Sequence, residues 1–262
     1  MKNKMIDNRS NNKPNYLKYT LTIAAVVVVG TITFGAACGV SNAGTGPATS
    51  PGTTANTATP ATNVPKTTPM PGMPKTDVAP RVLVDAGEFA ENIYDFAKAK
   101  DWTKTNEKLT RLEKAVADLK TQNLSTPQIV ETTNALSTAV QAKNEMDAMR
   151  ESNQMTFLIA EQSAKFNIKV PVEVIKLDYY GREIERLAMN KDEAKLKSTT
   201  AEMRQTWNTV KPKVETKGAT KEAAKFESLV VQTEKAASVA DYAKVAKPIL
   251  DEVDNLEKVF EK

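Results

Sequence analysis

The fold class is decided by residues 82–119, VLVDAGEFAENIYDFAKAKDWTKTNEKLTRLEKAVADL. Apolar side chains recur here at intervals of three and four positions, first at Phe89, Ile93 and Phe96. This spacing places apolar groups along one face of an α-helix and predicts an amphipathic helix. A second apolar series begins just after Asp101, and its members are Trp102, Leu109, Leu112, Val116 and Leu119. Because aspartate favours the position that precedes a helix, we expect a second helix to begin after Asp101.

Similar apolar series recur along the rest of the chain. They consist of Leu177, Ile184 and Leu187, then Leu196, Met203, Trp207 and Val210, and near the end Tyr242, Val245, Ile249, Val253, Leu256 and Phe260. Few segments alternate with the two-residue period of a β-strand. The sequence therefore predicts an all-α fold, a helical bundle.

Cap residues and prolines predict where individual helices begin and end. Asp192 follows a lysine as Asp101 does, so both are expected N-caps. Thr126 precedes a proline, and proline is favoured in the first turn of a helix. We expect Pro212 to close one helix and Thr220 to cap the next.

The segment of residues 127–165 could form one helix or two. An apolar series of small and flexible side chains runs through it without losing phase at Asn144, and its members are Ala135, Ala139, Ala142, Met146 and Met149. Because the phase is continuous, we predict a single bent helix.

The helical part also repeats internally. When the chain is aligned with itself at an offset of 91 residues, caps, prolines and core positions coincide. The coinciding pairs are Pro80 with Pro171, Phe89 with Tyr180, Ile93 with Ile184, Phe96 with Leu187, Asp101 with Asp192, and Leu112 with Met203. We therefore predict two related halves of three or four helices, residues 82–168 and 169–262, each a helical hairpin followed by a long third segment.

Residues 1–38 have the features of an export signal or membrane anchor. The uncharged stretch 20–37 follows a segment with one acidic residue, Asp7, and the basic residues Lys2, Lys4, Arg9, Lys13 and Lys18. Its length in helical form, ~27 Å, approaches the ~30 Å thickness of the hydrocarbon layer. Because flanking positive charge stays in the cytoplasm, we expect the rest of the chain on the extracytoplasmic face of the cell membrane.

The sequence Gly35-Ala36-Ala37-Cys38 resembles the lipobox of bacterial lipoproteins, in which small residues precede a cysteine that receives a diacylglycerol. The resemblance implies lipidation of Cys38 and attachment to the membrane. Gly35 stands where the family carries leucine or another aliphatic residue. Two alternatives remain open: an uncleaved transmembrane anchor, or cleavage at a site such as Ser41-Asn42-Ala43 that would release the protein.

Residues 39–81 form a predicted disordered linker. They are dominated by Thr, Pro, Ala, Gly and Ser, and such a composition buries too little apolar surface to offset the entropy of ordering. A flexible chain of this length reaches ~35 Å, so we expect a tether. Met70 and Met73 have a spacing that Cu(I) can use, but two thioethers alone make a weak site.

Composition excludes several classes of function. The formal charge of +4 comes from the N-terminal segment, because residues 82–262 carry 28 Lys and Arg against 30 Asp and Glu. We therefore expect no nucleic-acid partner. No histidine and a single cysteine occur, which excludes internal disulfides, Cys- or His-based metal sites and histidine-dependent nucleophilic catalysis. We expect no cofactor, no metal centre and no enzymatic activity.

Charged clusters and one tyrosine are the remaining candidate features. Acidic residues gather at the start of the first predicted helix and near the C-terminus, as Asp85, Glu88, Glu91 and Asp95, and as Asp251, Glu252, Asp254 and Glu257. We interpret both groups as solvent-facing, with cation binding as the alternative for the first. Alternating charges over 176–186, including the pair Asp178 and Arg182, predict a surface helix. Tyr179 points away from its apolar neighbour Tyr180 and is a candidate partner-binding residue.

Together these features predict a membrane-tethered, extracytoplasmic helical bundle of the bacterial cell envelope. We expect it to act as a binding or scaffold protein for another envelope protein or a wall polymer. The alternative is an extracytoplasmic metal-handling protein that uses carboxylates or methionines.

Overall fold

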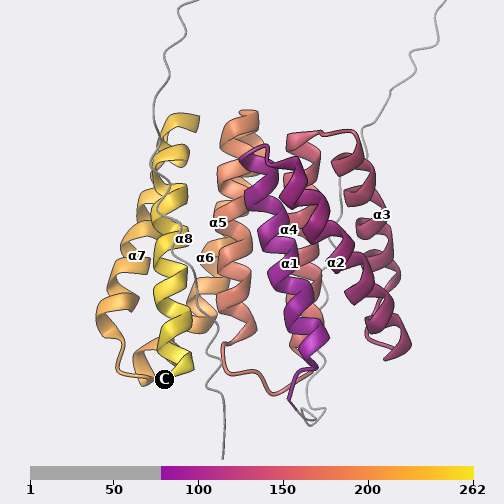
Figure 1. The fold of residues 1–262 in the computed structure, drawn as a ribbon. Coiled ribbons are helices and arrows are strands. Elements are labelled where there is room, and N and C mark those ends of the chain that lie inside the picture. The colour runs from indigo at the N-terminus through magenta and orange to yellow at the C-terminus, as the bar shows by residue number, and fades with distance from the viewer. Residues whose placement is uncertain (1–77) are drawn as a thin grey trace, which may run out of the picture. The chain divides into compact units, whose positions relative to one another are not determined.

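The computed structural model describes residues 78–262. Eight α-helices and no β-strand occur in that part of the chain, so the predicted all-α helical bundle is confirmed (Figure 1). The helices are α1 (Arg81–Lys98), α2 (Trp102–Thr121), α3 (Pro127–Gln141), α4 (Glu145–Ser163), α5 (Val172–Asn190), α6 (Glu193–Thr216), α7 (Thr220–Glu234) and α8 (Val239–Glu261).

The predicted signal or anchor, including Cys38, and the linker up to residue 77 lie outside the described residues. Met70 and Met73 lie there too. Within residues 78–262, no helix combines the length and the apolar character needed to cross a bilayer.

The helices pack in two groups of four. In the first, α1 packs on α2 and α4, and α3 packs on α2 and α4; in the second, α5 packs on α6 and α8, and α7 packs on α6 and α8. Helix α4 also packs on α5. The buried apolar side chains form two clusters, one between Leu83 and Ile159 and the other between Val174 and Phe260. Each group of four helices therefore has a core of its own.

The helix positions follow the offset found in the sequence. Helices α1 and α5 begin at Arg81 and Val172, and helices α2 and α6 begin at Trp102 and Glu193, a separation of 91 residues in both cases. The starts of α3 and α7 are 93 residues apart, and those of α4 and α8 are 94 residues apart. Each group therefore contains four helices, and not a hairpin followed by one long third segment.

The prediction of one helix over residues 127–165 is wrong. Helix α3 ends at Gln141 and α4 begins at Glu145. Between them Lys143 has a φ of 52°, in the left-handed region, and Asn144 accepts a hydrogen bond from the Asp147 N–H at 3.2 Å as an N-cap. The tight turn keeps apolar residues of both helices facing the core, so the apolar phase continues across a real break.

Several predicted helix ends are confirmed. The Asp101 carboxylate accepts from the Lys104 N–H at 3.1 Å, the Asp192 carboxylate from the Lys195 N–H at 3.2 Å, and Thr126 caps α3.

Two other predicted helix ends are wrong. Pro212 lies inside α6, which continues to Thr216. Its missing N–H is tolerated because Asn208, which carries the carbonyl left without a partner, is exposed to water. The N-cap of α7 is Ala219 and not Thr220.

Candidate anion-binding site

Helix α5 carries buried charges, so the prediction that it is a surface helix is wrong. Asp178 is 7% exposed and Arg182 is 9% exposed. The Arg182 guanidinium donates from Nε to Asp178 Oδ2 at 2.7 Å and from Nη1 to Asp95 Oδ1 on α1 at 2.8 Å. These bonds connect the first group of helices to the second.

Further polar contacts join α1 to α5. The Tyr94 hydroxyl donates to the Arg182 backbone carbonyl at 2.8 Å, and Lys98 pairs with Glu185 at 2.5 Å. Burial, followed by the negative charge of Glu185, raises the pKa of the Tyr94 hydroxyl far above its usual value. Tyr94 is fully buried, so its ring packs in the core while its hydroxyl donates a structural hydrogen bond.

Carboxylates from three helices surround Arg182. Burial, followed by the charge of Asp178, raises the pKa of Glu91 well above its usual value. Burial and the charges of Asp178 and Asp254 raise the pKa of Glu257 on α8 to about 7. Among the described residues, no three acidic or cysteine side chains are placed to hold a metal ion together. We interpret this group as structural.

The acidic residues of α8 were predicted to face solvent, and this is wrong for part of the group. Asp251 and Asp254 are exposed, but Glu252 is only 6% exposed. The Glu252 carboxylate accepts from Asn255 at 3.1 Å and lies 3.7 Å from the Lys225 ammonium of α7. Its position on the inner face of α8 follows from the packing of α7 on α8, which the local sequence does not indicate.

Tyr179, the candidate partner-binding residue, is half-buried. Its ring centroid lies 4.9 Å from that of Phe157 on α4, and its backbone carbonyl accepts from Asn153 at 3.1 Å. Tyr180 is buried in the core of the second group, as predicted. Tyr179 thus contributes to the contact between α4 and α5, and its partner-binding role stays a prediction.

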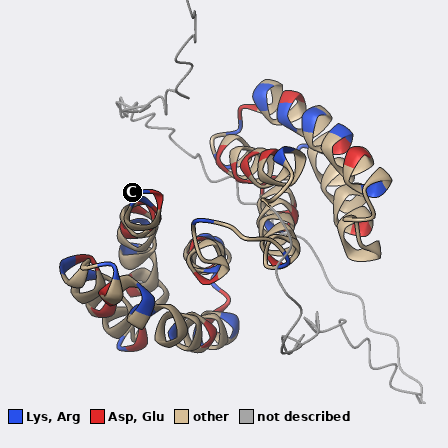
Figure 2. Cartoon of the chain, turned by 90° about the horizontal axis from the view of Figure 1, so that it is seen from below, with Lys and Arg blue, Asp and Glu red and all other residues tan. Residues whose placement is uncertain are grey.

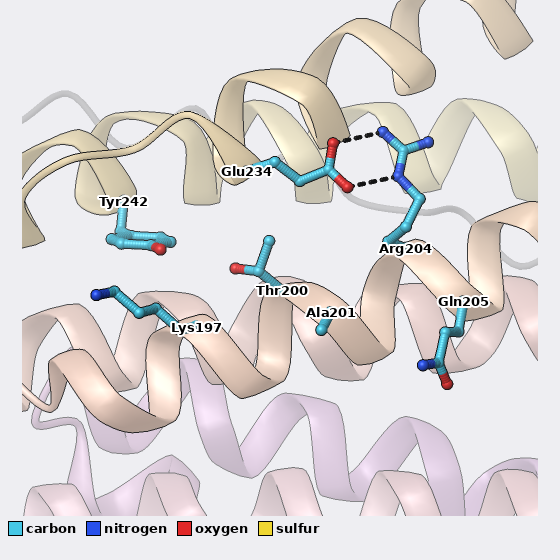
Figure 3. Close-up of a pocket in the computed structure, with 7 residues that line it drawn as sticks. All are labelled: Lys197, Thr200, Ala201, Arg204, Gln205, Glu234 and Tyr242. Carbon is cyan, nitrogen blue, oxygen red and sulfur yellow. Dashed lines mark hydrogen bonds and ion pairs between the residues drawn. The ribbon is translucent and has the colours of Figure 1, made fainter.

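One shallow pocket, with a volume of about 380 Å³, lies beside α6 (Figure 3). The C-terminal end of α7 and the N-terminal end of α8 form its other side. Its most prominent charge, Arg204, bonds Glu234 in a bidentate manner at 2.7 and 2.8 Å and also Glu227 at 2.7 Å. Glu227 additionally accepts from Trp207 at 2.8 Å and from Lys211 at 3.1 Å. Because these charges neutralise one another, we interpret the network as a clamp between α6 and α7.

A second pocket, of about 430 Å³, has a different charge balance. It lies where the turn between α6 and α7 meets the C-terminal end of α8, at the end of the bundle seen in Figure 2. We call it the basic pocket; it is lined by Lys217, Gly218, Ala219, Glu222, Lys225, Asn255, Lys258, Val259 and Lys262. Four lysines thus face one glutamate.

The lysines of the basic pocket are only weakly neutralised. Lys225 lies 3.7 Å from Glu252, and the Lys217 ammonium lies 5.8 Å from the Phe260 ring centroid. Neither Lys258 nor Lys262 forms a close ion pair with another described residue, although the Asp254 carboxylate one turn earlier on α8 interacts with the charge of Lys258. The pocket therefore holds an excess of positive charge that an anion can balance.

The backbone of the pocket adds to this positive character. Gly218, with a φ of 78°, turns the chain from α6 into α7. The N-cap Ala219 supplies no side-chain acceptor for the first backbone N–H groups of α7. A helix N-terminus carries partial positive charge and has N–H donors without acceptors inside the helix. Both features attract anions.

The first group of helices shows that the fold does not require these lysines. With a separation of 93 residues, Lys225 corresponds to Thr132, whereas the last turn of α8, with Lys258 and Lys262, has no helical counterpart because α4 ends at Ser163. Ala219 corresponds to Thr126, whose side chain caps α3. Helix α3 thus begins with a side-chain cap, and its counterpart α7 begins without one.

Sequence reasoning missed the basic pocket. Its lysines come from the α6–α7 turn, from α7 and from α8, and only Lys258 and Lys262 are spaced to share one helix face. The sequence predicted the turn at Gly218, but it did not indicate that α8 approaches that turn.

No protein-family model matches the chain, and neither a curated protein nor a solved structure matches it.

Proposed function

We propose that this protein is a membrane-tethered binding or scaffold module of the bacterial cell envelope that receives an anionic partner in the basic pocket. The observation that carries this proposal is the set of four lysines around one pocket in a helical part that is nearly neutral overall. A local excess of positive charge raises the concentration of anions at that surface.

The N-terminal sequence supports the location. The uncharged stretch 20–37, its basic flank and Cys38 are typical of an exported protein held at the membrane by a lipid or by an uncleaved anchor. A tether such as residues 39–81 lets the helical part reach ~35 Å from the bilayer. We expect such a reach to bring the helical part to anionic wall polymers or to acidic faces of envelope proteins.

The proposal is a binding role and not catalysis. The lysines that line the pocket are exposed side chains that attract anions by their charge. A scaffold that gathers partners at the membrane needs no more than this.

Cell fractionation with Cys38→Ala as the paired variant tests the location. We expect the full chain in the membrane fraction, digested by protease added to intact cells, and the variant either released or retained according to whether Cys38 is lipidated. Protection from external protease would contradict the proposal.

Co-sedimentation with isolated cell envelopes tests the binding role. We expect the full chain to sediment with envelopes at low salt and to be released as ionic strength rises, because screening weakens contacts between exposed charges. A chain that stays in the supernatant at every salt concentration would also contradict the proposal.

A further inference from the structure

We infer that the contact between the two groups of helices is a hinge controlled by protons. Its charged side, formed by α1, α5 and α8, closes when its carboxylates take up protons and opens when they release them. Its other side, formed by α4 and α5, stays together in both forms. The inference concerns the response of the fold to pH and does not depend on the basic pocket.

Helix α5 joins the two groups through two different faces. Asp178, Arg182 and Glu185 share one face, which meets α1, because residues three and four positions apart are neighbours on a helix surface. Tyr179 and Glu183 share the neighbouring face, which meets α4. The two groups therefore touch along two lines, and rotation about one line separates the other.

The side formed by α4 and α5 is held by packing and by paired charges. The Phe157 ring lies 4.9 Å from the Tyr179 ring, and the buried Asn153 amide donates to the Tyr179 carbonyl at 3.1 Å. Glu183, on the same face of α5, accepts from Arg186 at 3.0 Å. Because aromatic packing does not titrate and this carboxylate has its counter-charge, we expect this side to be the axis of the hinge.

The side formed by α1 and α5 is held by polar contacts. The Arg182 guanidinium donates to Asp95 at 2.8 Å, and the Tyr94 hydroxyl donates to the Arg182 backbone carbonyl at 2.8 Å. Lys98 pairs with Glu185 at 2.5 Å. The buried apolar side chains of the described residues form two separate clusters, one in each group, so no common core locks this side. An ion pair with an exposed member such as Asp95 contributes little stability, so a change of charge can outweigh it.

The charges on this side are unbalanced. We call the residues concerned the Arg182 cluster; its carboxylates are Glu91 and Asp95 of α1, Asp178 of α5, and Asp254, Glu257 and Glu261 of α8, and its cations are Arg182 and, beside Asp254, Lys258. None of the charges that act most strongly on Glu91 or Glu257 comes from the other described helices. Six carboxylates thus share two cations.

Glu91 and Glu257 are the members of the Arg182 cluster without a direct partner. The Arg182 guanidinium bonds Asp178 at 2.7 Å and Asp95 at 2.8 Å. Neither Glu91 nor Glu257 forms a hydrogen bond or an ion pair with another described residue. The charge of Glu257 acts on Glu91, although their helices, α8 and α1, lie on either side of α5 (Figure 1). When both carboxylates are ionised, their repulsion therefore pushes the two groups apart.

The environment of Glu91 couples its proton to the contact. Burial, followed by the charge of Asp178, raises its pKa well above the ordinary value of 4.5. Asp178, Arg182 and Glu257, which all act on it, belong to the second group of helices. Opening exposes Glu91 to water and removes these charges, so its pKa falls toward the ordinary value. The closed form therefore holds a proton that the open form releases.

Glu257 adds to the same response. Burial is the largest cause that raises its pKa to about 7, followed by the charges of Asp178 and Asp254. Because its charge reaches Glu91 across the contact, we expect α1 to shield it from water and opening to expose it. The advantage of the closed form is therefore complete below about pH 4.5 and is lost as the pH rises through 7.

Distances between spin labels on the full chain in a neutral detergent test the hinge. In a Cys38→Ser background, Ala99→Cys and Ala240→Cys place labels at exposed positions, one directly after α1 and one in α8. A second pair, Ala224→Cys and Ala240→Cys, lies within the second group of helices. Pulsed electron paramagnetic resonance at pH 5 and pH 8 gives the distance distribution of each pair.

We expect the ratio of long to short distances in the first pair to rise at least about ten-fold from pH 5 to pH 8, while the second pair stays constant. A change of about ten-fold corresponds to a fall of one in the pKa of a single carboxylate on opening. Glu91→Gln/Glu257→Gln imitates the protonated form and should keep the short distance at pH 8. Its matched control, Glu113→Gln/Glu131→Gln, removes two exposed carboxylates and should open as the wild type does.

Four outcomes would overturn the inference. The same distances in the first pair at both pH values would show that the contact stays closed. A change in both pairs would mean that the second group itself loses its structure. Opening of the Glu91→Gln/Glu257→Gln variant to the extent of the wild type would place the titrating groups elsewhere. A control that stays closed would assign the response to total charge and not to the Arg182 cluster.

Discussion

Arg182 of α5 donates a hydrogen bond to Asp95 of α1 at 2.8 Å, although 87 residues separate the two in the chain. The same guanidinium bonds Asp178 of its own helix at 2.7 Å. The two carboxylates differ in burial, because the Asp95 side chain is 60% exposed and the Asp178 side chain only 11%. The loss of the bond to the buried Asp178 should therefore lower stability more than the loss of the bond to the exposed Asp95.

Arg182→Met should lower the free energy of unfolding by about 3–5 kcal/mol, because it leaves the buried Asp178 carboxylate without its counter-charge. Asp95→Asn should lower it by less than about 1 kcal/mol, because an exposed partner interacts weakly. Urea denaturation of both variants measures the difference. Equal losses would show that the bond between α1 and α5, and not the burial of Asp178, dominates the contribution of Arg182.

Glu257 should make the stability of the protein depend on pH. Its pKa is raised from an ordinary value of 4.5 to about 7 by burial and by the charges of Asp178 and Asp254, with Arg182 opposing. Between these two values the folded protein holds a proton that the unfolded chain has released. Its contribution to stability is therefore complete below about pH 4.5 and is lost as the pH rises toward 7.

Glu257→Gln should match the wild type at pH 4 and exceed it by about 3 kcal/mol at pH 8, because glutamine resembles the protonated acid. Thermal denaturation at the two pH values provides the measurement. Since Glu91 faces the same group with a raised pKa, the variant should reduce the pH dependence without abolishing it. A difference between variant and wild type that is the same at both pH values would contradict the assignment.

The all-α class and the repeat were predictable because their signals are local. Apolar spacing and cap residues such as Asp101 and Asp192 act over one or two helical turns. The burial of Asp178 and Arg182 was not predictable, because the same spacing of opposite charges stabilises exposed helices. It depends on α1 and α8, whose charges reach α5 from positions distant in sequence.

The break at Lys143 and the basic pocket escaped prediction for related reasons. A left-handed turn residue is usually glycine, so a lysine there carries no recognisable signal. The pocket lysines are separated along the chain and meet only because α8 ends beside the α6–α7 turn. Tertiary packing, and not local pattern, creates both the buried charges and the candidate site.

Two helices of the second group differ in their N-caps, because α6 has an aspartate cap and α7 has none. Asp192→Ala should lower the free energy of unfolding by about 1 kcal/mol, because the Lys195 N–H loses its acceptor. Ala219→Ser should raise it by about 0.5 kcal/mol, because a hydroxyl can accept from the first turn of α7. Both values come from chemical denaturation. A loss in the serine variant would show that the nearly buried Ala219 position has no room for the hydroxyl.

The two helical glycines should respond to alanine with opposite signs. A Cβ on Gly181 of α5 would lie 2.7 Å from Leu250 Cδ2 and 3.1 Å from Ile249 Cγ2 of α8, so Gly181→Ala should destabilise the fold by about 1–3 kcal/mol. A Cβ on Gly87 of α1 would meet its nearest atom, Ile159 Cγ2, at 3.5 Å. Gly87→Ala should therefore stabilise by about 0.5–1 kcal/mol through helix propensity alone.

Urea denaturation of the single variants, and of Gly181→Ala combined with Leu250→Ala, tests the origin of this difference. Removing the Leu250 side chain takes away the closest clash, so the double variant should lose less than the sum of the two single losses. Additive losses would mean that Leu250 turns aside freely. Gly181 would then not set the distance at which α8 packs on α5.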